Sequence, residues 1–103
     1  MKVALTAWED RISPVFDSSR RLLIAEIDNG EIVSKRYESF FPEMSARLAG
    51  VLKSLGIDVL ICGAISQFPA SILENSGILL IPFVSGNADM VSPIFINIVN
   101  YFS

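Results

Sequence analysis

Histidine is absent from this 103-residue chain, and cysteine occurs once, as Cys62. The absence of histidine excludes an imidazole metal ligand and an imidazole base. A single cysteine cannot form an intrachain disulfide, and an unpaired thiol is typical of a reducing compartment. We therefore expect a cytoplasmic protein.

Long apolar runs are also absent. The longest stretches without a charged residue, 59–73 and 90–103, are short and are interrupted by Gly, Pro, Ser or Asn, so neither is predicted to cross a bilayer. The N-terminus becomes acidic after six uncharged residues, which argues against a signal peptide. We expect a soluble protein with no membrane partner.

Positive charge is scarce, because the net charge is −3 and no Lys or Arg follows Lys53. Proteins that bind nucleic acids display a basic face, so we expect no nucleic-acid partner. Only two charged residues, Glu74 and Asp89, lie beyond Asp58. The second half is predicted to supply more than its share of the core, or else a surface that another chain covers.

The apolar pattern predicts a single α/β domain over residues 1–103. Asn29-Gly30 supplies the positive φ angles of a tight hairpin turn between two strands. Met44, Leu48, Val51 and Leu52 recur at helical spacing. The predicted strands are 2–7, 21–27, 31–37, 57–62 and 78–83, and the predicted helices are 42–55, 67–75 and 88–102. The strands 2–7, 57–62 and 78–83 are predicted to be buried.

This order of elements restricts the topology. Short links favour an antiparallel meander of the first three strands, and each later strand-helix-strand unit favours a right-handed parallel crossover. We predict a ribonuclease H-like fold: a five-stranded mixed sheet in the order 3-2-1-4-5, with strand 2 antiparallel and three helices on both faces. The loops at 8–17, 63–66 and 84–87 then emerge at one edge, where open α/β sheets bind ligands.

The chain resembles the dinitrogenase iron-molybdenum cofactor biosynthesis family over nearly its whole length. The resemblance rests on Ile12-Ser13-Pro14-Val15-Phe16-Asp17, on the Asn29-Gly30 hairpin, on Leu55-Gly56-Ile57-Asp58-Val59-Leu60-Ile61-Cys62-Gly63-Ala64-Ile65, and on Gly77-Ile78. It implies a non-catalytic binding or carrier protein, related to nitrogen fixation, for an iron-molybdenum cofactor precursor or an iron-sulfur cluster. Many members have Ser-x-His-Phe, whereas this chain has Val15 before Phe16.

Ten residues are candidates for the site. Cys62 is the only thiolate that could ligate a metal, although a free cysteine at the end of an apolar strand more often packs in the core. Arg11 is the choice for contacting an anionic ligand. Trp8 could cover a ligand or fill the sheet end, Ser66 suits a helix N-cap, and Phe16 suits a core anchor. The predicted cofactor contacts are Trp8, Asp10, Arg11, Ser13, Phe16, Gly63, Ala64, Ser66 and Gly86.

Two other functions stay open. Phe40, Phe41, Ile96 and Tyr101 are apolar groups that one small core would not absorb, which predicts a homodimeric interaction module. A metal-dependent nuclease would need carboxylates from several strands converging on paired ions. The first strand is followed by Glu9 and Asp10, but the fourth ends in Cys62 and the fifth in Phe83, so we expect no enzyme.

Overall fold

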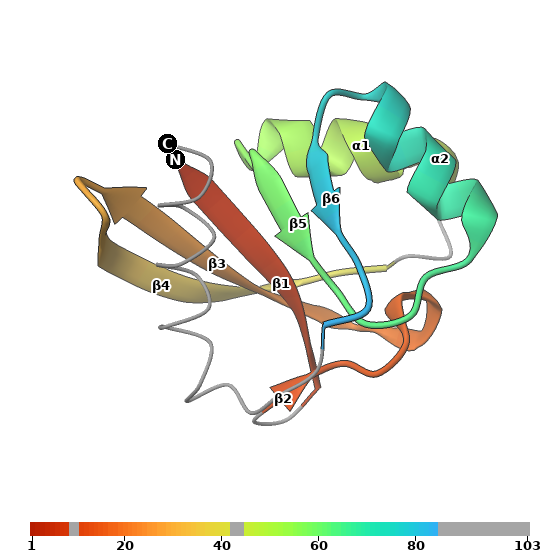
Figure 1. Ribbon diagram of the computed structural model, residues 1–103, viewed down its shortest axis with the longest axis horizontal. Coiled ribbons are helices and arrows are strands. Elements are labelled where there is room, and N and C mark those ends of the chain that lie inside the picture. Colours follow the sequence, from red (N-terminus) through yellow and green to blue (C-terminus); the bar gives the residue numbers. More distant parts are fainter. Residues whose placement is uncertain (9–10, 42–44, 85–103) are drawn as a thin grey trace.

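The computed structural model describes residues 1–8, 11–41 and 45–84. The described elements follow one another as strands, a 3-10 turn and two helices (Figure 1). They are β1 (Lys2–Trp8), β2 (Arg11–Ile12), η1 (Phe16–Ser18), β3 (Arg21–Asp28), β4 (Glu31–Ser39), α1 (Ser45–Ser54), β5 (Val59–Ile61), α2 (Gln67–Asn75) and β6 (Leu79–Ile81).

The strands form one mixed sheet in the order β4-β3-β1-β5-β6. β3 runs antiparallel to β1 and β4, whereas β5 lies parallel to β1 and to β6. This order and these directions confirm the predicted arrangement of five strands. The whole segment after the first strand was predicted to be a loop, and this prediction was wrong in one respect. Arg11–Ile12 pairs with Ala7 and Trp8 and forms a sixth strand of two residues.

The hairpin between β3 and β4 has the predicted turn. Asn29 and Gly30 have φ angles of 54° and 77°, the left-handed values that a two-residue turn requires. Because the turn is so short, it fixes the strand register, and Asp28 faces Glu31 across it.

The side chains of β1 alternate between two buried layers, as a strand covered on both faces requires. Val3, Leu5 and Ala7 pack on one face. Ala4 packs on the other, where α1 contributes Leu48 and Leu52 and α2 contributes Leu73. Among the described residues, both helices therefore lie on one face of the sheet, as Figure 1 shows. The predicted third helix, 88–102, lies outside the described residues.

Two predictions of burial were wrong. Val51 is 46% exposed although its spacing placed it on the apolar stripe of α1, because the packed face of that helix is the one that carries Leu48 and Leu52. β6 is only partly buried, with Leu79 exposed, because it has just one neighbour, β5, among the described strands.

Phe40 and Phe41, both expected at a dimer surface, differ in burial. Phe40 is buried, and its ring meets that of Phe16 edge to face at a centroid distance of 5.4 Å, so this small core does absorb it. Phe41 is exposed. Ile96 and Tyr101 lie outside the described residues.

In the described part of the chain, neither helix has the length and hydropathy needed to cross a membrane.

Candidate functional site

Three segments far apart in the sequence meet where β1, β5 and β6 end (Figure 1). Val15 forms a parallel bridge with Ala64. The Phe16 amide donates to the Ala64 carbonyl at 2.7 Å, and the Ala64 amide donates to the Pro14 carbonyl at 2.9 Å. The segment after β1 is therefore joined by backbone hydrogen bonds to the segment after β5. Both lie at the same edge of the sheet, as predicted, although the hydrogen bonds between them were not predicted.

The third segment is joined in the same way. The Phe83 amide donates to the Gly63 carbonyl, and the Val84 amide donates to the Cys62 carbonyl, both at 3.0 Å. Phe83 has a φ of 65° and is 75% exposed, an unfavourable backbone conformation for a residue with a bulky side chain. The predicted contacts Gly86 and Asp10 lie outside the described residues.

Gly63 is required at this junction because the two segments touch there. A Cβ atom on Gly63 would lie 2.5 Å from the Ser13 carbonyl oxygen and closer still to that of Pro14. Both neighbours are backbone atoms, so neither can rotate away. Gly63 and Ala64 therefore hold the site together through the backbone rather than through side chains.

The Val15 carbonyl oxygen gathers an unusual number of donors. The hydroxyls of Ser13, Ser18 and Ser19 donate to it at 3.1, 3.3 and 3.0 Å, and the Ser18 amide approaches at 3.4 Å. A carbonyl oxygen has two lone pairs, so these donors compete for one acceptor. The Val15 carbonyl oxygen is therefore surrounded by more donors than it has lone pairs.

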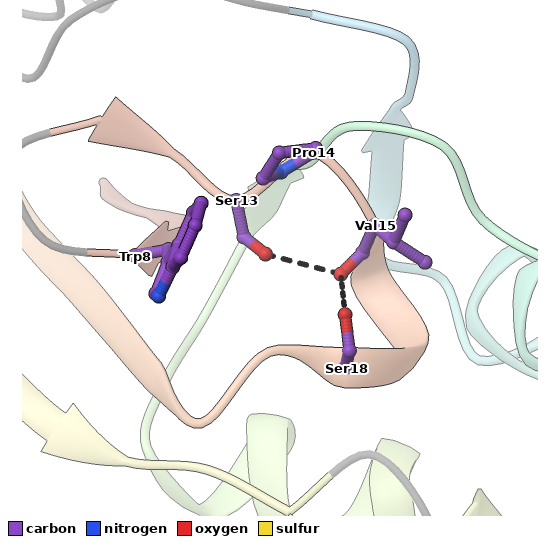
Figure 2. A pocket seen from close by; sticks show the side chains of 5 residues that line it. All are labelled: Trp8, Ser13, Pro14, Val15 and Ser18. Carbon is purple, nitrogen blue, oxygen red and sulfur yellow. Dashed lines mark hydrogen bonds between the residues drawn. The ribbon is translucent and has the colours of Figure 1, made fainter.

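An open hollow of about 340 Å³, called the Trp8 hollow here, lies beside this cluster. Figure 2 shows the Trp8 indole on one side, with the hydroxyls of Ser13 and Ser18 turned toward the Val15 carbonyl on the other. Trp8 is 50% exposed, so it borders the hollow and does not fill the sheet end. The lining residues are Trp8, Ser13, Pro14, Val15 and Ser18.

A second hollow of about 330 Å³, called the arginine hollow here, shares Trp8 and Ser18 with the first. Its other lining residues are Ala7, Ser19, Arg20 and Arg21. None of these four residues is among the contacts predicted from the sequence. The signal was available in Ser18-Ser19-Arg20-Arg21, a run of hydroxyls and cations directly before a strand.

Arg11, predicted to contact an anion, lies against Trp8. Its guanidinium carbon is 4.8 Å from the centroid of the indole ring, within the range of a cation–π contact. The backbone pairing of Trp8 with Arg11 in the β1–β2 ladder places the two side chains together. A positive charge therefore borders the indole that both hollows share.

The structure confirms the prediction that Ser66 is the N-cap residue of α2. Its side chain, however, makes no hydrogen bond to the helix. Instead, Asp17 accepts hydrogen bonds from the Ser66 amide at 3.2 Å and from its hydroxyl at 2.9 Å. A carboxylate is favourable near the positive end of a helix, and its bonds to Ser66 tie η1 to α2.

Cys62 faces the core beneath the helices. It is fully buried in the layer that contains Phe16 and Leu60, which confirms core packing. Desolvation, with a smaller contribution from the nearby Asp17 carboxylate, raises the pKa of the Cys62 thiol to about 12. Phe16 is fully buried too and is a core anchor rather than a surface contact.

The family model described as "Dinitrogenase iron-molybdenum cofactor" matches residues 1–93. The chain belongs to this family. The match covers most of the sequence, and the junction of segments 13–16 and 62–64 lies inside it. This confirms the resemblance drawn from the sequence. A comparison with curated proteins gives no match.

Several solved structures share the fold of this member of the dinitrogenase iron-molybdenum cofactor family. PH0822 is 22% identical, with 94% of this chain and 91% of that chain covered and a TM-score of 0.84. A candidate dinitrogenase from Methanococcus jannaschii is 25% identical, with 94% and 87% covered and a TM-score of 0.67. The apo orange protein from Desulfovibrio gigas is 18% identical, with 93% and 87% covered and a TM-score of 0.70.

Proposed function

We propose that this protein carries a preformed iron-molybdenum or iron-sulfur type cofactor, or a precursor of one, as noncovalent cargo in the Trp8 hollow. The observation that carries the proposal is the position of the only cysteine. Cys62 lies in the core with no exposed surface, and the chain has no histidine. The side chains that ordinarily ligate clusters are therefore unavailable at the surface.

With its raised pKa, the Cys62 thiol is protonated at neutral pH, whereas the metal ligand is the thiolate. With a pKa near 12, ionising Cys62 at pH 7 would cost roughly 7 kcal/mol. This cost, together with the burial of Cys62 in the layer that contains Phe16, favours contact through the indole, the Ser18 hydroxyl and Arg11 over ligation by Cys62.

The Trp8 hollow suits an anionic cargo in size and chemistry. Its volume of about 340 Å³ lies within the range of sites for small molecules. Trp8 offers a large flat surface, the exposed Ser18 offers a hydroxyl group whose contact with the Val15 carbonyl is long, at 3.3 Å, and Arg11 adds a positive charge against the indole. Val15 lines the same hollow with an apolar group.

The proposal includes a non-catalytic role and a ribonuclease H-like class of fold. The strand order and the antiparallel β3 support that class. A nuclease centre is not proposed, because no three His, Cys, Asp or Glu side chains come together within residues 1–8, 11–41 and 45–84. Asp17, the acid that the structure describes at this edge, is engaged by Ser66.

Anaerobic loading with isolated iron-molybdenum cofactor tests the proposal. After gel filtration, we expect wild type and Cys62→Ala to retain equal amounts of molybdenum and iron per chain. Trp8→Ala should lower retention at least fivefold, whereas Phe68→Ala, which removes an exposed aromatic lining neither hollow, should leave it unchanged. Loss of both metals in folded Cys62→Ala, or full retention in Trp8→Ala, would overturn it.

A second experiment loads the protein with iron and sulfide alone, without molybdenum. A chromophore that forms in wild type and disappears in Cys62→Ala would also contradict noncovalent binding, since it would show ligation by the thiolate.

A further inference from the structure

We propose that the arginine hollow binds a small organic carboxylate, with the carboxylate group at Arg21 and the apolar body of the ligand against Trp8. This goes beyond the carrier function, because the ligand is a small acid and not a metal cofactor. The hollow combines an apolar lining from Ala7 and Trp8 with a polar lining that includes Ser18 and Arg21. No negatively charged residue is among the lining residues that the structure describes.

Arg21 is the cation that binds the carboxylate. Its guanidinium carbon lies 4.1 Å from the centroid of the Tyr37 ring, so the side chain is already held in place and loses little entropy when it binds a ligand. A guanidinium that lies over a ring still has N–H donors in its own plane, and their fork matches the two oxygens of a carboxylate. Arg20 also lines the hollow, but its side chain already has partners, among them the Ser19 carbonyl at 2.8 Å, so it has no part in the proposed binding. One guanidinium balances one carboxylate, whereas it would leave half the charge of a dianion unbalanced.

The Ser18 hydroxyl supplies a second donor at little cost. Four donors converge on the Val15 carbonyl oxygen, which has lone pairs for two. The Ser18 hydroxyl makes the longest of the three hydroxyl contacts, at 3.3 Å, and its residue is exposed. If it rotates toward a carboxylate, the Val15 carbonyl keeps the hydroxyls of Ser13 and Ser19, so no acceptor is left unpaired.

The apolar part of the lining favours an organic ligand over an inorganic ion. Trp8 is 50% exposed, and its large flat indole releases water when an apolar group covers it. The volume of about 330 Å³ lies within the range of sites for small molecules. A serine hydroxyl and a guanidinium bind a carboxylate without transforming it, so the chemistry of the lining fits a ligand that is held and released unchanged.

Trp8 provides the readout, because it lines the arginine hollow and is the only tryptophan of the chain. We would titrate its fluorescence with sodium hexanoate, sodium acetate and uncharged hexanamide at neutral pH and constant ionic strength, and count bound ligand by equilibrium dialysis. Each methylene group that leaves water contributes about fourfold to affinity. With part of its chain buried, hexanoate should bind at least tenfold more tightly than acetate. It should also bind at least tenfold more tightly than hexanamide, which lacks the charge.

Variants locate the site. Arg21→Gln should weaken hexanoate binding about tenfold, to the level of hexanamide, and Ser18→Ala should weaken it at least threefold. Ser54→Ala removes a similar hydroxyl bond, to the Val51 carbonyl at the end of α1, and Arg36→Gln removes an arginine on β4 that lines neither hollow. Both controls should bind hexanoate as wild type does.

Equal affinities for hexanoate and hexanamide, equal affinities for hexanoate and acetate, or unaltered hexanoate binding in folded Arg21→Gln would overturn the proposal. So would the absence of saturable hexanoate binding to wild type in both fluorescence and dialysis. The titration contains no metal cluster. Its failure would therefore leave the carrier function standing, and failure of cofactor loading would leave the carboxylate site standing.

Discussion

Replacing Gly63 with alanine should break the junction that builds the site. The new Cβ would lie 2.5 Å from the Ser13 carbonyl oxygen and closer still to that of Pro14, so the segment after β1 must move away from the segment after β5. That movement strains the two backbone bonds between them, from the Phe16 amide and from the Ala64 amide.

The expected loss of stability follows from these contacts. Two backbone hydrogen bonds contribute about 0.5–1.5 kcal/mol each. Overpacking by one methyl group costs about 1–3 kcal/mol. With partial relaxation, we expect Gly63→Ala to lower the free energy of unfolding by about 3 kcal/mol, which for a domain of this size lowers Tm by roughly 12–24 °C.

Urea unfolding followed by far-UV circular dichroism measures this loss. Gly50→Ala is the matched control, because a Cβ on Gly50 meets nothing within 4 Å and the residue lies inside α1. Alanine is favoured over glycine there by about 0.5–1 kcal/mol, so the control should be stabilised. A Gly63→Ala protein within 0.5 kcal/mol of wild type would refute the described junction.

Other predictions concern single groups. Because burial raises the pKa of Cys62 from 9.0 to about 12, the unfolded chain ionises first, and stability should fall by up to about 1.4 kcal/mol per pH unit between pH 9 and 12. In urea unfolding measured across this pH range, Cys62→Ala should lack this decrease in stability. An equal dependence of stability on pH in wild type and Cys62→Ala would contradict the prediction. Thr6→Val should stabilise by about 1 kcal/mol, because the buried Thr6 hydroxyl has no partner in the part of the chain that the structure describes; destabilisation would show a missed bond. Asp17→Ala removes the acceptor of Ser66 and should cost about 1 kcal/mol, which thermal unfolding would measure and an unchanged Tm would refute. Finally, we expect no DNA or RNA cleavage with magnesium or manganese in gel assays, and turnover by purified protein would contradict the non-catalytic role.

Local signals made most of the fold predictable. The Asn29-Gly30 turn and the apolar strands on either side of the helices set the sheet order, because short links leave few topologies. The helix Gln67–Asn75 begins and ends as predicted. Exposure of Val51 could not be predicted in this way, since helical spacing gives a stripe but not the rotation of the helix against its neighbours.

The site was predictable in location but not in composition. The parallel directions of β1, β5 and β6 place Trp8, Ser13 and Gly63 at one edge, as expected. Pairing of Arg11 with Trp8 depends on the two-residue β2, which is too short to leave a periodic pattern. The role of Asp17 depends on η1 meeting α2 across 49 positions of sequence, a contact that no local signal encodes.

The most direct test of the noncovalent cargo site is a fluorescence titration of Trp8 with isolated iron-molybdenum cofactor under anaerobic conditions. We expect saturable quenching with the same Kd, within about twofold, in wild type and Cys62→Ala. A Kd that rises tenfold or more in folded Cys62→Ala would show that the thiol ligates the cofactor. No quenching of wild type while the cofactor co-elutes with it would show that the cofactor does not bind beside Trp8.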